Sequence, residues 1–354
     1  MRFEKPCPDC DSTSPDRREF LKTAAGAAMA GAAVLGAPMS VVRAAPPTAS
    51  SAAEQALSAL YATLTDMQKR TVCFDWDHTQ TGEGNRGLLR THVSNNWQIT
   101  RPHIDSDFYT AEQKRILFDI FKGIIHPDWH TRIQRQLRDD TEGRPWGAAQ
   151  SIAIFGRPGS DKYECVMTGR HMTIRCDGNT TPNVAFGGPI FYGHAASGFN
   201  ETTGHPGNVF WNQAQRANFV YRMLDDRQKR AALIERRPAE AAVAFRGAAG
   251  GYPGLPVSDM SSDQKDELRR VLACLVEPYR QEDRDDAMAC LNRQGGLDRC
   301  SLAFYRDGDI GNDGEWDNWR LEGPAFVWYY RGHPHVHVWV NIADDPTVAL
   351  NARG

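Results

Sequence analysis

Residues 333–340 read HPHVHVWV and hold the densest group of potential metal ligands in the chain. If they form a strand, His335 and His337 project from one face with Cα atoms about 6.5 Å apart, so both imidazoles can reach one ion. Histidines on a strand also serve as hydrogen-bonding surface groups or as satisfied core groups, and the pair alone leaves that alternative open. The spacing predicts two ligands of a metal site, and a third must come from elsewhere.

His171 is the strongest candidate for the third ligand. It lies two residues after Gly169, and glycine lets the backbone turn or approach another strand closely. The alternative for His171 is a core histidine bonded to a backbone carbonyl. The glycine-rich segment 187–208 adds His194, a possible fourth ligand or substrate contact, and His205, a weaker candidate.

Three neutral imidazoles leave an open coordination position on a metal. On zinc that position activates water, and on copper or iron it engages an oxidant. The sequence therefore predicts one transition metal ion (copper, iron or zinc) and a metal-dependent oxidoreductase or hydrolase whose substrate and catalytic residues stay unassigned. A non-catalytic periplasmic protein that binds a metal or a small ligand would use the same histidines, and a purely structural protein would need no metal. The neighbouring aromatic residues either wall the site or pack in the core: Trp328, Tyr329, Tyr330 and Trp339.

Two other polar segments carry weaker signals. Residues 74–78 (FDWDH) place a carboxylate beside a histidine, which supports proton transfer, but a solvated turn is favoured there. Residues 307–315 (DGDIGNDGE) resemble a calcium loop but lack its bidentate glutamate, so a polar hairpin loop is favoured. The sequence has no Gly-x-Ser-x-Gly elbow, Walker loop or His-Glu-x-x-His motif, which argues against several common exported enzymes.

The N-terminal residues 1–44 have the pattern of a twin-arginine signal peptide. Arg17 and Arg18 precede a Phe-Leu-Lys triplet, the apolar run 23–37 and a small-residue cleavage region at 42–45. The expected partner is the twin-arginine export machinery, and the expected location is periplasmic or secreted. This route carries folded proteins, often with a cofactor already inserted, and so favours a metal or redox site.

Composition excludes several other partners for the mature chain. Over the whole sequence the 41 Lys and Arg residues nearly balance the 44 Asp and Glu residues, and a net charge of -3 gives no reason to expect nucleic acid or anionic lipid. No later stretch approaches the roughly 20 apolar residues of a membrane helix, so no integral span is expected. The Pro-, Ala- and Ser-rich residues 45–55 are expected to be a linker, followed by a single domain at 56–354.

Six cysteines remain after residues 1–44 are removed, because Cys7 and Cys10 leave with the signal. An oxidising compartment permits disulfides, and proximity in sequence favours the pairs Cys165/Cys176 and Cys290/Cys300. At least one of these pairs is expected to be bonded. Buried free thiols that pack as small apolar groups are the alternative.

The elements that must position these residues follow from capping and periodicity. Four segments have the capping-box pattern of a helix start, with a Gln three places after a Thr, Asp or Ser: 65–68, 110–113, 225–228 and 261–264. Strands are predicted at 151–155, 163–167 and 171–176, and 325–330 and 335–340 form a terminal hairpin. Helices flanking a strand-rich middle predict an α+β fold with a mainly antiparallel sheet.

Several of these pieces together resemble a bacterial family known as domain of unknown function 3500. The matching segments are 109–113, 154–158, 169–173, 323–326 and 335–339. The resemblance runs over nearly all of the mature sequence and implies no particular reaction. Where the family usually shows two adjacent histidines after the glycine, this chain has Arg170-His171, so the resemblance carries over only His171 as a ligand candidate.

Overall fold

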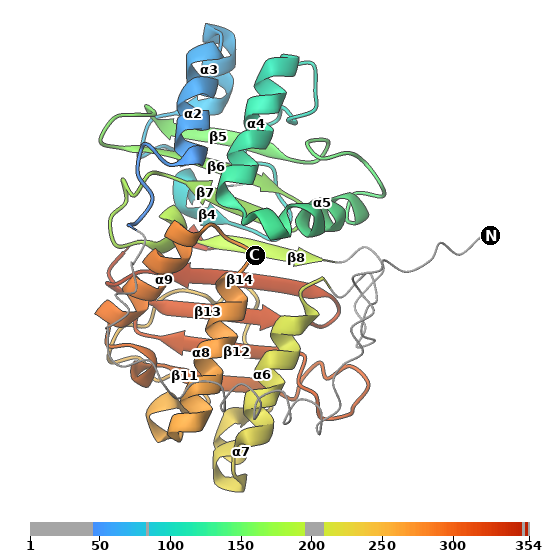
Figure 1. Cartoon of the computed structure of the whole chain (residues 1–354), viewed down its shortest axis with the longest axis vertical. Coiled ribbons are helices and arrows are strands. Elements are labelled where there is room, and N and C mark those ends of the chain that lie inside the picture. The colour runs from blue at the N-terminus through green and yellow to red at the C-terminus, as the bar shows by residue number, and fades with distance from the viewer. Residues whose placement is uncertain (1–44, 83–84, 195–208, 349–350, 353–354) are drawn as a thin grey trace, which may run out of the picture. The chain divides into compact units, whose positions relative to one another are not determined.

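The computed structural model describes residues 45–82, 85–194, 209–348 and 351–352, and residues 44–354 cluster as one compact unit. Its centre is a large mixed sheet in the order β1-β5-β6-β7-β8-β14-β13-β12-β11-β10, with β9 also pairing β11 (Figure 1). The predicted α+β fold with a mainly antiparallel sheet is confirmed. The strands of this sheet are β1 (Cys73–Phe74), β5 (Ser151–Gly156), β6 (Tyr163–Gly169), β7 (Met172–Cys176), β8 (Ile190–His194), β9 (Leu233–Ile234), β10 (Leu255–Pro256), β11 (Ser301–Tyr305), β12 (Asn318–Gly323), β13 (Phe326–Arg331) and β14 (Val336–Ile342).

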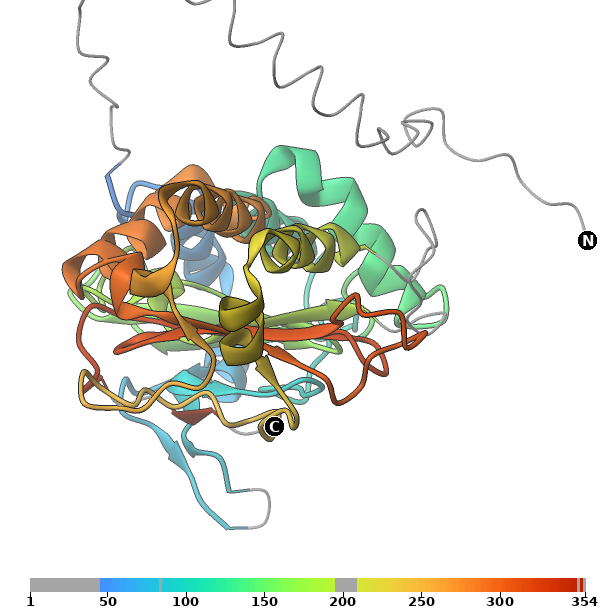
Figure 2. The same cartoon turned by 90° about the horizontal axis from the view of Figure 1, so that it is seen from below.

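The helices pack on one face of this sheet, and irregular segments cover the other (Figure 2). The helices are α2 (Ala52–Thr63), α3 (Asp66–Val72), α4 (Ala111–Ile124), α5 (His130–Asp139), α6 (Trp211–Met223), α7 (Asp226–Ala232), α8 (Ser262–Val276) and α9 (Gln281–Arg293). These irregular segments form a second layer, which includes two short strand pairs: β2 (Thr79–Gln80) with β3 (Gly87–Leu88), and β4 (His92–Val93) with β15 (Asn351–Ala352). None of the described helices is long and apolar enough to cross a membrane.

All four predicted capping boxes form, at the starts of α3, α4, α7 and α8. Their glutamines also join the helices in pairs. Gln68 and Gln113 exchange side-chain hydrogen bonds of 2.9 and 3.1 Å, and Gln228 and Gln264 exchange bonds of 3.0 and 2.8 Å. Each buried amide therefore satisfies its neighbour while it caps its own helix.

The two joined helix pairs belong to two halves of the chain with the same topology. In the first half β1 runs parallel to β5, and β5, β6, β7 and β8 follow as antiparallel neighbours; in the second, β9, β11, β12, β13 and β14 repeat this pattern. The β6–β7 turn opens with Gly169 opposite Met172, and the β12–β13 turn opens with Gly323 opposite Phe326. The halves meet where β8 pairs antiparallel with β14, in the middle of the sheet.

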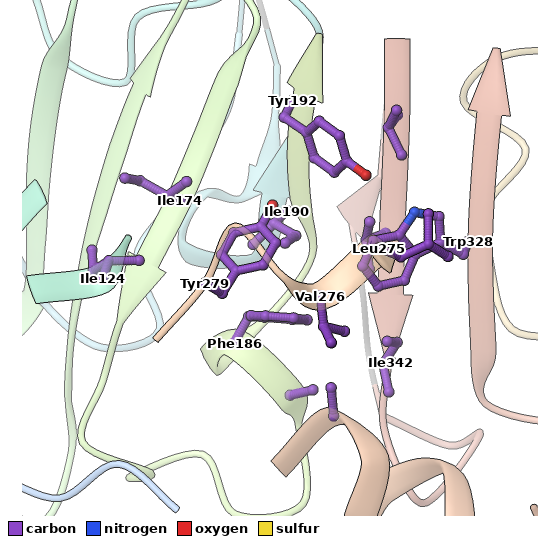
Figure 3. Close-up of a cluster of buried hydrophobic side chains, with 14 of the residues drawn as sticks. Ile124, Ile174, Phe186, Ile190, Tyr192, Leu275, Val276, Tyr279, Trp328 and Ile342 are labelled. Carbon is purple, nitrogen blue, oxygen red and sulfur yellow. The ribbon is translucent and has the colours of Figure 1, made fainter. Parts of the chain in front are cut away.

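The main core lies between the sheet and the helix layer. Figure 3 shows Tyr192 of β8 and Trp328 of β13 turned toward Leu275 and Val276 of α8, with Ile174 of β7 beside Ile124 of α4. All six residues are buried. Because strand residues alternate faces, Val336 and Val338 enter this core while His337 and Trp339 face the second layer.

Two expectations from the sequence differ from the structure. Helix α2 begins at Ala52, inside the segment 45–55 that was predicted to be a linker, and Glu54 in its first turn is fully buried. The expected disulfides are wrong in the structure, where all six described cysteines are free thiols.

The cysteine environments match the alternative of buried free thiols. Cys165 and Cys176 face each other across β6 and β7, where a hydrogen bond between the two thiols and burial raise the pKa of the Cys176 thiol. Cys290 donates from Sγ to the carbonyl of Asn183 (3.5 Å), whereas Cys300 is 4.0 Å from the carbonyl of Gly296. Buried in this way, the thiols pack as small apolar groups.

Candidate metal centre

The terminal hairpin brings His335 and His337 together as the alternation of a strand requires. β13 and β14 pair as predicted, and β14 begins one residue after His335. The Nε2 atoms of His335 and His337 lie 2.8 Å apart. His337 is buried and His335 is partly exposed, so the pair opens toward solvent on the side of His335.

His171 reaches this pair from the turn between β6 and β7. Its φ of 55° lies in the left-handed region, which is uncommon for a residue with a Cβ, and its backbone N–H donates to the carbonyl of Asn95 (3.0 Å). Its Nε2 is 3.1 Å from His337 Nε2. Gly193 of β8 permits the close approach of β14, because a Cβ there would lie 2.3 Å from the carbonyl oxygen of Val336.

The three imidazoles therefore converge on one point. Their nearest ligand atoms all lie within 4.8 Å of one another. Around a tetrahedral ion with metal–nitrogen bonds of about 2.0 to 2.1 Å, ligand nitrogens are about 3.3 Å apart. His337 Nε2 is 2.8 and 3.1 Å from the Nε2 atoms of His335 and His171, so each of these two distances needs to widen by about half an ångström or less to match this.

A carboxylate lies behind each of the two buried histidines. Asp140, the residue just after α5, has Oδ2 2.7 Å from His171 Nδ1, and Glu240 Oε1 accepts from His337 Nδ1. An imidazole that donates from Nδ1 to a carboxylate is in the tautomer whose Nε2 lone pair is free. Asp140 comes from the helix layer and Glu240 from the second layer, so the two rings are fixed from opposite sides of the sheet.

The electrostatics of the centre match this arrangement. Burial opposes ionisation of Glu240, but its hydrogen bond and charge interaction with His337 lower the pKa of the carboxyl to about 2. Burial and the neighbouring imidazoles lower the pKa of His335 to about 3, and burial lowers that of His337 to about 4. Both rings are therefore neutral at neutral pH, and protons compete for their nitrogens only well below the ordinary histidine pKa of about 6.5.

Other candidates from the sequence lie outside this group. His194 is buried on β8, opposite Val336, and its Nδ1 is 3.7 Å from Asp140 Oδ1. His194 thus lies behind the centre, close to the carboxylate that His171 also contacts. It is not among the three converging ligands. His205 falls outside the described residues.

The remaining polar and aromatic candidates are divided by the sheet. Trp339 approaches the centre indirectly, since its Nε1 is 3.4 Å from Glu240 Oε1, and Tyr329 lies on the same face. Trp328 and Tyr330 face the main core. His78 packs against Phe74 with ring centroids 4.7 Å apart, and residues 307–315 form the loop between β11 and β12.

Among the residues that the structure describes, the position equivalent to this centre in the repeat carries no such ligands. In the register of the two halves, Ala325 is the counterpart of His171. Val184 pairs with Ala343 as His337 pairs with Gly193, so Val184 is the counterpart of His337. Val184, Ala325 and Ala343 form a small apolar cluster there. The junction of the two halves thus carries ligands at one position and apolar core residues at the position equivalent to it.

We expect Asp140→Asn and Glu240→Gln to weaken metal binding by about tenfold to a hundredfold each, because the amide no longer matches the charge and tautomer of its histidine. Competition with a metal-binding dye measures the affinity. Glu235→Gln is the matched control, since the Glu235 side chain is 76% exposed and pairs only with Arg306 among its described ion-pair partners. Equal affinities in all three variants would contradict the role given to the carboxylates.

Comparison with known proteins identifies the family. No curated protein and no solved structure matches the chain. The model of one family matches residues 47–343, which is most of the sequence and includes all three histidines. The chain therefore belongs to the family described as protein of unknown function (DUF3500).

Proposed function

We propose that this chain is an exported metalloprotein that holds one transition metal ion on the Nε2 atoms of His171, His335 and His337. The observation that carries the proposal is the pair of carboxylates on Nδ1 of the two buried rings. Histidines that serve only as core groups do not need three nitrogens aimed at one point, whereas metal ligands are commonly oriented by a carboxylate in this way.

The proposed activity is metal-dependent catalysis, hydrolytic or redox. A metal with three neutral imidazole ligands can activate water or engage an oxidant at its open position. His335 is partly exposed, so a small molecule can approach from that side. The imidazole set suits copper, iron and zinc alike. A non-catalytic protein that binds a metal or a small ligand is the second candidate, because the same open position would serve it.

Elemental analysis of protein exported by its native route tests the metal. One ion of copper, iron or zinc per chain, removed by a chelator, supports the proposal, and folded protein without metal contradicts it. A panel of ester, phosphoester and phenol substrates then tests catalysis. Turnover that is lost on chelation and restored by the metal supports an enzyme, whereas metal binding without any turnover favours the second candidate.

Export is proposed from the sequence and has its own test. We expect Arg17→Lys/Arg18→Lys to leave uncut precursor in the cytoplasm, because the twin-arginine pair is the element that the export machinery reads. Immunoblots of periplasmic and cytoplasmic fractions measure this. Arg43→Lys is the control, since it changes an arginine outside the pair. Normal periplasmic accumulation of the double variant would refute this route.

A further inference from the structure

An arginine lies beside the metal centre, and the proposed function does not yet use it. Arg331, the last residue of β13, is the direct cross-strand partner of His337, so both side chains leave the sheet on the same face. Arg331 Nη1 is 3.4 Å from Glu240 Oε2, on the carboxylate that accepts from His337. Glu240 therefore holds the guanidinium next to the histidines.

The other edge of the Arg331 guanidinium carries donors without acceptors. Its Nε and Nη2 are enclosed and have no hydrogen-bond partner among the residues that the structure describes. The N–H bonds of these two atoms run parallel, which is the geometry that pairs with both oxygens of one carboxylate. An enclosed donor left unpaired is unfavourable, so an acceptor from outside the chain would remove a penalty.

The surrounding charges favour an acceptor with one negative charge. A divalent metal and Arg331 contribute three positive charges, and Asp140 and Glu240 contribute two negative charges, which leaves one positive charge. Nearby Arg237 is offset by Asp307, whose Oδ2 is 3.6 Å from its Nε. A monoanionic carboxylate balances this site, whereas a phosphate dianion would exceed it.

We propose that the centre binds a small carboxylate whose two oxygens pair with Nε and Nη2 of Arg331 while another donor atom of the same molecule takes the open position on the metal. The metal half of this inference rests on the proposed function. The Arg331 half does not, because the guanidinium is held by Glu240 whether or not an ion is bound. The carboxylate would anchor and orient the substrate, and the metal would act on the neighbouring atom.

Ligand-observed NMR titrations with glycolate, a carboxylate that carries a hydroxyl group, test the inference on metal-loaded and metal-stripped protein. We expect glycolate to bind the loaded protein more tightly than acetamide or inorganic phosphate does. Arg331→Met should weaken glycolate binding by about tenfold to a hundredfold with the metal content unchanged. Arg331→Lys should recover only part of the affinity, since an ammonium lacks the parallel pair of donors. Arg306→Met is the control, as Arg306 is 54% exposed and pairs with Glu235.

The metal centre and the carboxylate site at Arg331 are contradicted by different results. If the wild type carries no metal, the proposed function fails, and glycolate binding that still depends on Arg331 would uphold the anion site alone. If the metal is present but Arg331→Met binds glycolate as tightly as the wild type does, the inference is overturned and the metal centre stands. Tighter binding of phosphate than of glycolate would also overturn the assignment to a carboxylate.

Discussion

The double variant His335→Ala/His337→Ala is expected to lose its metal completely, from one ion per chain to none, while the protein remains folded. Two of the three converging nitrogens disappear together, and one imidazole does not hold a transition metal ion in competition with water and buffer. Metal content by mass spectrometry of the native protein, read together with circular dichroism, measures the effect. Each single His→Ala change should also lower metal content sharply.

His126→Ala is the matched control for this experiment. His126 lies just after α4, partly exposed, and its Nδ1 contacts only the Asp128 backbone N–H and carboxylate among the described residues. We expect it to keep the full metal content. Retention of the ion by a folded His335→Ala/His337→Ala protein would show that these histidines do not form the metal centre. It would favour a purely structural role for them.

Arg280→Met is expected to lower the free energy of unfolding by about 3 to 5 kcal/mol, the cost of leaving a buried charge without its partner. Arg280 contacts both oxygens of Glu54 at 2.7 and 2.8 Å and Asp283 at 2.9 Å. Glu54 is fully buried, and Arg280 and Asp283 are nearly so. The variant keeps the two carboxylates in the interior and removes the cation between them.

Urea denaturation at a fixed metal content measures the change. Arg269→Met is the control, because Arg269 and its partner Asp266 are each 58% exposed, and such surface pairs contribute at most about 1 kcal/mol. Similar losses of unfolding free energy in the two variants would show that the buried ion pair stabilises the fold no more than an exposed pair does. Attachment of helix α2 to the start of α9 would then not depend on the pair of Glu54 and Arg280.

The ligands of the centre could be predicted because they depend on local rules. The period of a strand places His335 and His337 on one face, and Gly169 marks the turn that carries His171. The helix starts were predictable for the same reason, since a capping box lies within four consecutive residues.

The carboxylates and Arg331 could not be predicted, because their positions depend on tertiary packing. Glu240 belongs to an irregular segment whose placement under β14 is fixed by contacts such as the one from Asn341 Nδ2 to the Val243 carbonyl (2.7 Å). Asp140 reaches His171 only after α5 packs on the sheet. The duplication could not be predicted from the sequence either, because the two halves share strand register and not an evident sequence repeat. The four capping boxes and the glycines at 169 and 323 are its clearest traces in the sequence.

The position of the centre at the junction of β8 and β14 gives a bound ion a second consequence. The first half supplies His171 and Asp140, and the second supplies His335, His337 and Glu240. The ion would therefore act as a cross-link between two repeats, much as a metal at a dimer interface ties two subunits together. Part of its binding free energy would then oppose separation of the halves, so that loss of the metal would loosen the seam of the sheet before either half unfolds.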